Sequence, residues 1–248
     1  MNINECLEKF KAVSLSDIKS VSLMDRVDVK FVFRRLKLSQ LLEELADFYN
    51  VLEVDGVKIQ SYKSLYYDTI DKGFFIAHHN NRVNRNKVRF REYVGSGLVF
   101  LEVKLKNNKG KTIKNRIKVD AIPDSLSNEH QNYIRKIIGK DLVLTSQQWV
   151  NFDRITFVDK MNTERLTIDL NLTFSNQINS GSFEQIIVAE IKKERSGNSS
   201  KFSRLAKKMH ILPVRLSKYC MSMIYLEPNI KQNRFKEKLL LINKLKQV

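Results

Sequence analysis

Basic side chains recur at alternate positions in several segments of this chain. One segment carries Lys87, Arg89 and Arg91 on one side, opposite Val88 and Phe90. Side chains of a β-strand alternate between the two faces of a sheet, so the three cations point the same way. Guanidinium and ammonium groups gathered like this bind phosphate or carboxylate oxygens. The same alternation places further cations on such faces: Lys30, Lys104, Lys106, Lys114, Arg116, Arg154, Arg165 and Lys192.

The charge balance of the whole chain points to the same class of ligand. It has 44 Lys and Arg against 27 Asp and Glu, a net charge of 44 − 27 = +17. Self-repulsion of that size destabilises a compact state that lacks counter-charge, so we expect an anionic partner. Nucleic acid, small phosphate compounds and acidic membrane all qualify. Four carboxylates lie on the cationic faces: Asp28, Glu102, Asp169 and Glu190.

The elements that would position these residues are mainly strands. Period-two segments over 61–119 and 152–195 are separated by Gly- and Asn-rich breaks, which indicates hairpins. Apolar residues at helical spacing predict helices at 1–23, 36–50, 125–139 and 229–248, and Gly139 is a plausible C-cap for the third. No linker interrupts the chain, so we expect one domain over 1–248.

Composition excludes several classes of protein. The hydrophobic share of 42% is enough for a core, which excludes bulk disorder. No uncharged apolar run reaches the ~18 residues of a membrane-spanning helix. Residues 1–10 lack the basic segment followed by an apolar segment that is typical of a signal peptide. Cys6 and Cys220 lie far apart without metal-ligand spacing. We therefore expect a cytoplasmic protein without a transmembrane segment.

Two architectures explain strands with one apolar and one cationic face. In the first, the cationic faces point to water and form a surface suited to nucleic acid. In the second, the sheet closes into a barrel with the cations in its lumen, and the amphipathic helices cover its apolar outside. The alternation alone leaves the two about equally favoured. A buried basic lumen requires a polyanion to offset its desolvation.

The order of several motifs resembles the VTC domain, the catalytic domain of the vacuolar transporter chaperone, which belongs to the CYTH-like triphosphate tunnel metalloenzymes. The resemblance spans about 20–226, and 227–248 would form a C-terminal helix. Its first motifs are RVDVKFVF at 26–33, YDT at 67–69, AHHN at 77–80, KVRFREY at 87–93 and FLEVKLK at 100–106. The later ones are KTIKNR at 111–116, FDRIT at 152–156, RLTID at 165–169, EIK at 190–192 and SKY at 217–219.

The resemblance implies an α+β fold with a closed antiparallel barrel, the triphosphate tunnel, flanked by helices. It implies transfer of the ATP γ-phosphate to a growing inorganic polyphosphate chain. The smaller tunnel phosphatases carry an ExExK signature where this chain has Asp28-x-Lys30, which argues against a plain triphosphatase. The family's phosphate ligands match Lys30, Arg89, Arg91, Lys104, Lys114, Arg154 and Lys218; of these, only Lys218 is not indicated by the alternation.

The resemblance also implies a divalent cation, Mn²⁺ or Mg²⁺, at Glu190. Such metals accept one or two protein carboxylates while phosphate oxygens of the substrate supply other ligands. Glu102 and Asp169 are possible additional ligands, and an ion pair with a neighbouring cation is about as plausible for each. We expect Lys106, Arg116, Arg165 and Lys192 to bind substrate along the tunnel, although the first three fit a solvated rim equally well.

Three other functions compete with a polyphosphate polymerase. A related tunnel could hydrolyse triphosphate or polyphosphate and release free phosphate. A non-catalytic polyphosphate-binding accessory protein is the second alternative, and Glu190 beside a full set of cations argues against it. Nucleic-acid binding would need aromatic stacking positions on an exposed face, which these strands do not supply. The sequence predicts no oligomeric state, and a separate membrane partner would be needed for export of the product.

Overall fold

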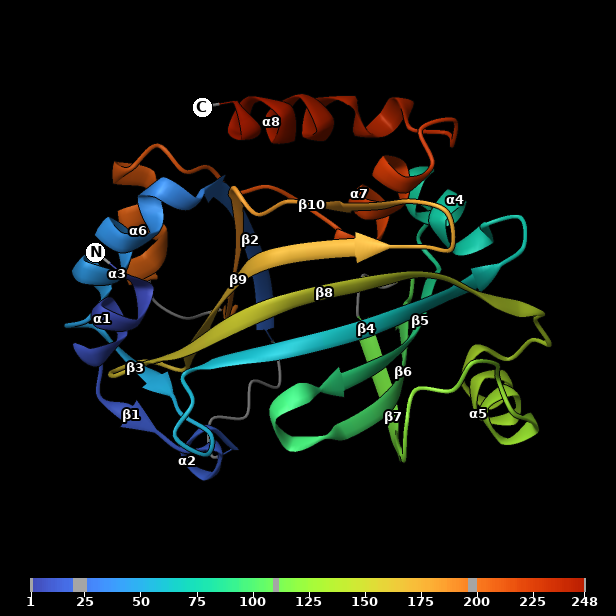
Figure 1. The fold of residues 1–248 in the computed structure, drawn as a ribbon, viewed down its shortest axis with the longest axis horizontal. Coiled ribbons are helices and arrows are strands. Elements are labelled where there is room, and N and C mark those ends of the chain that lie inside the picture. The colour runs from blue at the N-terminus through green and yellow to red at the C-terminus, as the bar shows by residue number, and fades with distance from the viewer. Residues whose placement is uncertain (1, 20–25, 109–111, 196–199, 248) are drawn as a thin grey trace.

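The computed structural model describes residues 2–19, 26–108, 112–195 and 200–247, and a large sheet is its main feature (Figure 1). Eight strands follow the order β2-β11-β9-β8-β4-β5-β6-β7, and β1, β3 and β10 attach beside this path. The strands are β1 (Ala12–Val13), β2 (Arg26–Arg34), β3 (Tyr49–Leu52), β4 (Ile59–Thr69), β5 (Arg85–Tyr93), β6 (Leu98–Lys106), β7 (Thr112–Val119), β8 (Leu144–Asp159), β9 (Glu164–Ser175), β10 (Ser180–Ser182) and β11 (Ile186–Glu194).

Every neighbouring pair on this path is antiparallel, as the hairpin signals indicate. β2 and β7 are the two ends of the path, and within the described ranges no ladder joins them. The fold is therefore α+β, with a large antiparallel sheet and flanking helices. No helix of the described part of the chain is long and apolar enough to cross a bilayer.

One face of the sheet is apolar and packs against helices. On β2, Phe31 and Phe33 face a core that also holds Leu41 of α3 (Leu38–Leu45) and Phe202 of α6 (Lys201–Lys208). On the other half of the sheet, Phe90 lies in a second core that includes Ile134 of α5 (Asn128–Ile138). These helices cover the apolar side, so the cationic residues are left on the opposite face.

That opposite face, which carries Lys30, Arg89, Arg154 and Glu190, we call the cationic face. α7 (Lys218–Leu226) packs against it, and Tyr219 of this helix stacks on Tyr66 of β4 with ring centroids 5.0 Å apart. α8 (Lys236–Lys246) lies across α7 and the β10 region (Figure 1). One part of the cationic face is thus filled by a core that includes α7 and α8.

Two lysines show that the sheet curls around the cationic face. Lys30 of β2 donates to the Leu216 carbonyl at 3.1 Å, and Lys87 of β5 donates to the Ser217 hydroxyl at 2.9 Å. In a flat sheet the five steps from β2 to β5 would separate these strands by about 24 Å. Side chains of a flat sheet stand roughly perpendicular to it, so two lysines that far apart would not reach consecutive residues. The strands must therefore bend toward each other around the segment that leads into α7.

Some predicted helices differ from those observed. The helix expected at 1–23 is two short ones, α1 (Ile3–Glu8) and α2 (Leu15–Lys19), because β1 between them pairs with β3; residues 20–23 lie outside the described residues. The helix expected at 36–50 ends at Leu45, because Tyr49 begins β3. An unpredicted helix, α4 (Gly73–His79), follows β4. α5 is confirmed, with Ser127 as N-cap and Gly139 as left-handed C-cap, and the C-terminal helix is shorter than expected.

Candidate functional site

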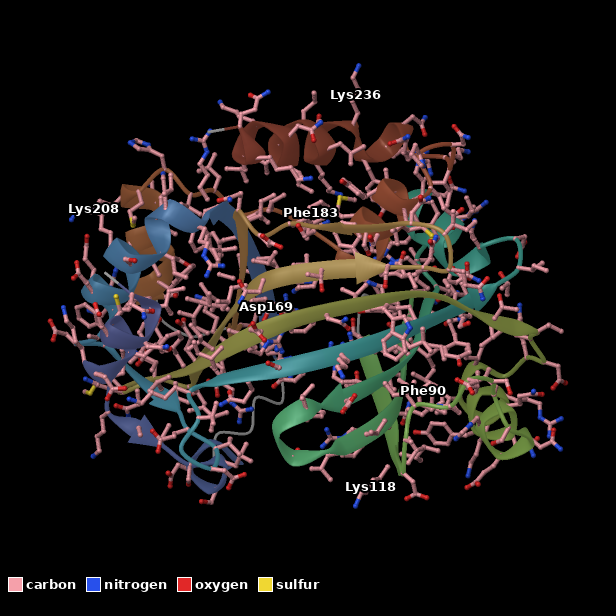
Figure 2. All side chains as sticks on the ribbon, in the orientation of Figure 1. Phe90, Lys118, Asp169, Phe183, Lys208 and Lys236 are labelled. Carbon is pink, nitrogen blue, oxygen red and sulfur yellow. The ribbon has the colours of Figure 1, made fainter. Side chains whose placement is uncertain are left out.

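The strand register brings the predicted site residues together on the cationic face. Lys87, Lys104 and Lys114 lie opposite one another across β5, β6 and β7, and Arg89, Glu102 and Arg116 form the next row. On the other half of the sheet, Lys30 lies opposite Glu190. Figure 2 places Asp169 in the middle of the molecule, whereas Lys118, Lys208 and Lys236 extend from its edge. The alternation of the sequence therefore places the charges correctly.

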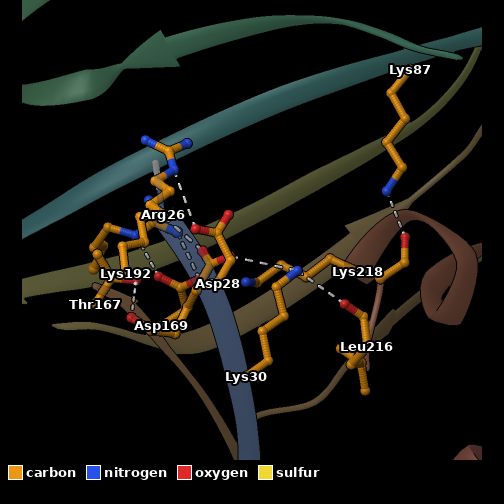
Figure 3. A network of polar contacts seen from close by, with 12 residues as sticks. Arg26, Asp28, Lys30, Lys87, Thr167, Asp169, Lys192, Leu216 and Lys218 are labelled. Carbon is orange, nitrogen blue, oxygen red and sulfur yellow. Dashed lines mark hydrogen bonds and ion pairs between the residues drawn. The ribbon is translucent and has the colours of Figure 1, made fainter. Parts of the chain in front are cut away.

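Asp169 is the centre of a first cluster. Arg154 donates to both of its carboxylate oxygens, at 2.5 and 2.8 Å, and Lys218 forms an ion pair with it from α7. Figure 3 shows Lys218 reaching this carboxylate beside Lys30. Burial opposes ionisation, but the Arg154 guanidinium and the Lys218 ammonium outweigh it and hold the pKa of Asp169 well below its usual range. Lys218 thus lies beside Asp169 on the cationic face.

Glu102 is the centre of a second cluster. Arg89 donates to one carboxylate oxygen at 2.9 and 2.6 Å, and the Lys114 ammonium lies 2.5 Å from the other. The Glu102 side chain is 0% exposed, and Arg89 also donates to the Tyr66 hydroxyl at 2.8 Å. Burial opposes ionisation of Glu102, but Arg89 and its neighbours hold its pKa well below normal. Both oxygens are occupied by cations, which favours the ion-pair role over the metal-ligand role.

Several cations of this face have no carboxylate beside them. Among the described residues, Lys104 and Arg91 have no acidic group within ion-pair distance. Positive charge on Arg89, together with burial, lowers the pKa of Lys104 well below its ordinary value. Burial, and then Arg89, lower the pKa of Arg91 to about 10. A surplus of buried positive charge is costly without an anion, so this face is suited to bind one.

Glu190 differs from the other two carboxylates. Its ion pairs are longer, 3.8 Å to Lys30 and 3.5 Å to Lys192, and its side chain is 18% exposed. Burial opposes ionisation, but Lys192 and Lys30 lower its pKa to about 2, so it is charged at neutral pH. Within the described ranges no three His, Cys, Asp or Glu side chains gather to hold a metal. Glu190 fits a divalent cation whose other ligands come from a phosphate substrate.

The residues expected along the tunnel lie toward the margins. Arg116 is exposed and packs its guanidinium carbon 4.6 Å from the centre of the Phe100 ring. Lys106 is half-buried at the end of β6. Lys192 and Arg165 lie opposite each other on β11 and β9, at the end of the face where Arg26 pairs with Asp28 (Figure 3). Of these four, Lys192 lies nearest to the proposed metal residue.

Several residues of this face were not among the candidate ligands. The alternation placed Lys87 on the same strand face as Arg89 and Arg91, but the resemblance did not imply it as a phosphate ligand. Tyr66 gave no signal, because it stands in an apolar run, yet Arg89, Arg91 and Lys87 overcome its burial and lower its pKa to about 8. Tyr62 and Phe152 also lie among the cations.

The order of these residues along the chain, and not only their clustering, agrees with one known family. The sequence model of the VTC domain matches residues 25–227, most of the chain. The chain belongs to the VTC domain family. Membership confirms the expected resemblance, with boundaries within a few residues of those predicted. No curated protein matches the chain.

The VTC-domain chain also resembles solved structures at low identity. A candidate adenylate cyclase from Vibrio parahaemolyticus is 12% identical, with 80% of this chain and 99% of that chain covered and a TM-score of 0.46. A candidate adenylate cyclase from Bacillus halodurans is also 12% identical, covering 78% and 94%, with a TM-score of 0.47. An adenylyl cyclase candidate from Hippeastrum with dominant triphosphatase activity is 15% identical, covering 80% and 94%, with a TM-score of 0.46.

Proposed function

We propose that this VTC-domain chain is a polyphosphate polymerase, which transfers the γ-phosphoryl group of ATP to the end of an inorganic polyphosphate chain. The observation that carries the proposal is the surplus of buried and half-buried cations on a curled sheet. Arg91 and Lys104 have no carboxylate partner among the described residues, and Lys104 lies between two other lysines. A linear polyanion supplies many negative charges along one path, which matches a surface whose cations come from strands all around it.

The proposal includes closure of the curled sheet into a tunnel. Lys30 and Lys87 already approach from distant strands to consecutive residues before α7. The remaining opening lies between β2 and β7, the ends of the strand path. In this arrangement α7 covers one part of the cationic face, and Lys192, Arg165 and Arg26 mark the other end. The polyphosphate chain would enter or leave the tunnel at that end.

In this reaction the protein mainly positions the reactants and stabilises negative charge. An oxygen of the terminal phosphate attacks the γ-phosphorus of ATP, the bond to the β–γ bridging oxygen breaks, and ADP leaves. Arg91, Lys104 and Lys218 supply donors to the non-bridging oxygens as charge shifts between them. Arg89 and Arg154 are oriented for the same purpose by Glu102 and Asp169. Terminal phosphate oxygens are largely ionised at neutral pH, so the site needs no separate base.

Glu190 is the residue that would hold the divalent cation, Mn²⁺ or Mg²⁺. Such a cation neutralises phosphate charge and aligns donor and acceptor. Lys30 and Lys192 flank the Glu190 carboxylate and keep it ionised, which preserves an oxygen ligand at any physiological pH. We further propose that the protein acts in the cytoplasm, where ATP is the donor, and that nucleic acid is not its ligand.

The test is an assay of purified full-length protein with ATP and Mn²⁺ that measures ADP and resolves phosphate chains by length. We expect ADP and long chains from the wild type and neither from Glu190→Ala. Lys114→Ala should reduce synthesis strongly. Lys118→Ala is the matched control, since Lys118 follows Lys114 on the same strand but extends into solvent (Figure 2). Release of free phosphate instead of chains would identify a hydrolase, and binding without turnover an accessory protein.

A further inference from the structure

Two aromatic side chains lie on the cationic face in a position that charge alone does not explain. Tyr62 of β4 and Phe152 of β8 are directly opposite in their ladder, and their rings stack with centroids 5.3 Å apart and planes 10° apart. Both side chains are buried. Both rings belong to the core that includes α7 and α8, and they also contact arginines of the cationic face. We call the two rings the aromatic pair.

Cations from three separate elements contact the aromatic pair. The Arg91 guanidinium carbon lies 5.4 Å from the Tyr62 centroid and 5.5 Å from that of Phe152. The corresponding distances for Arg154 are 5.3 and 5.1 Å. The Lys218 ammonium of α7 lies 4.8 Å from the Phe152 centroid. All are within the ~6 Å range of cation–π attraction, which is strongest where water is excluded.

The aromatic pair lies between the two charged clusters. Arg91 is opposite Ser64 and Arg154 is opposite Gln60, so their strand partners stand two residues to either side of Tyr62. Four residues of a strand span about 13 Å. The two guanidinium groups nevertheless lie within 5.5 Å of the same ring centroid. The pair is therefore in contact with an arginine beside the Glu102 cluster and with an arginine of the Asp169 cluster.

A ring holds a cation without cancelling its charge. Glu102 orients Arg89 but also neutralises it, because a carboxylate brings a full negative charge. An aromatic face attracts the cation through its quadrupole and has no net charge. Arg91 is held by the Ser64 hydroxyl at 3.3 Å and by the two rings. Among the described residues no carboxylate lies within ion-pair distance of Arg91, so its charge is available to an anionic ligand.

We propose that Tyr62 and Phe152 are positioning residues, which hold Arg91, Arg154 and Lys218 at a separation that suits successive phosphates of one condensed chain. The pair would thereby make the site prefer triphosphate and longer chains over orthophosphate. Orthophosphate contacts one charged cluster at a time, so the spacing between the cations does not increase its affinity. This inference rests on the proposed function, because it names what selects that function's substrate class.

The experiment measures binding of sodium triphosphate and of orthophosphate to full-length protein by calorimetry, without ATP or metal. The test variants are Tyr62→Leu and Phe152→Leu, with Phe152→Met as a milder loss of the ring should leucine prevent folding. Tyr62→Phe keeps the ring and should behave as wild type. The matched control is Phe157→Leu, which removes a fully buried ring from the same strand β8 on the opposite, apolar face.

We expect loss of either ring to weaken triphosphate binding by about tenfold and orthophosphate binding by less than about twofold. Phe157→Leu should leave both affinities unchanged even if it lowers the melting temperature. Three results would overturn this inference but not the proposed function. They are an equal loss of affinity for triphosphate and orthophosphate, an unchanged affinity for triphosphate, and the same loss of triphosphate affinity in Phe157→Leu. A wild-type protein that does not bind triphosphate would overturn the proposed function as well.

Discussion

Arg154 and Asp169 lie directly opposite each other on β8 and β9 and form a two-point ion pair, with N–O distances of 2.5 and 2.8 Å. Lys218 of α7 joins the same carboxylate. One buried acid therefore ties two strands and the helix that covers the cationic face into a single unit. This pair contributes to the stability of the fold as well as to the site.

Removal of this acid should destabilise the protein strongly. Asp169→Asn leaves Arg154 and Lys218 buried without a counter-charge, and breaking a buried pair in this way costs about 3–5 kcal/mol. Urea unfolding would measure the loss. The control is Glu43→Gln at the exposed Lys9–Glu43 pair, whose removal should cost less than about 1 kcal/mol. Equal losses in the two variants would contradict the structural role of Asp169.

Removal of one central lysine should have the opposite effect on stability. Lys104 lies between Lys87 and Lys114 across three strands, and like charges directly opposite in a sheet destabilise it. We expect Lys104→Met to stabilise the anion-free protein by about 1 kcal/mol and to weaken triphosphate binding by about tenfold. Lys118→Met, whose cross-strand partner is Phe100, should change neither quantity. If Lys104→Met instead lowers stability, Lys104 makes stabilising contacts within the protein, which would contradict this prediction.

The pH dependence of stability follows from the carboxylates. The pKa of Glu190 is about 2 in the folded chain and 4.5 as its ordinary value. Because the folded value is the lower one, its contribution is complete above pH 4.5 and is lost as pH falls toward 2. The shift corresponds to at most about 3–4 kcal/mol. Between pH 6 and pH 2, the urea midpoint of unfolding should fall more steeply for the wild type than for Glu190→Gln. Parallel curves would contradict a lowered pKa of Glu190 in the folded protein.

The alternation of residue types was enough to predict the cationic face. A strand offers only two faces, so Arg89, Lys104 and Glu102 could be placed from position in the sequence alone. Lys218 could not, since it begins a helix and its direction depends on how α7 packs. The contact of the Tyr62–Phe152 pair with arginines was equally hidden, because both residues also belong to an apolar core and the cross-strand register is not visible in the sequence.

The helices were predicted less well, for a physical reason. Apolar spacing at 36–50 fits a helix over its whole length, but Tyr49 and Val51 are buried in the core of a sheet by pairing with β8. Such long-range pairing outweighs local propensity. Curling of the sheet is also a property of distant contacts, and it becomes visible only where Lys30 and Lys87 reach consecutive residues.

The fate of the γ-phosphate tests the central proposal most directly. Full-length protein is incubated with ATP labelled in its γ-phosphate and with Mn²⁺. The label is followed into polyphosphate and orthophosphate, and the unlabelled ADP is measured separately. A polymerase places the label in long acid-insoluble chains with one ADP released for each phosphate added, and Glu190→Ala places none there. Recovery of the label as orthophosphate, with no labelled chain under varied metal and primer conditions, would contradict the account.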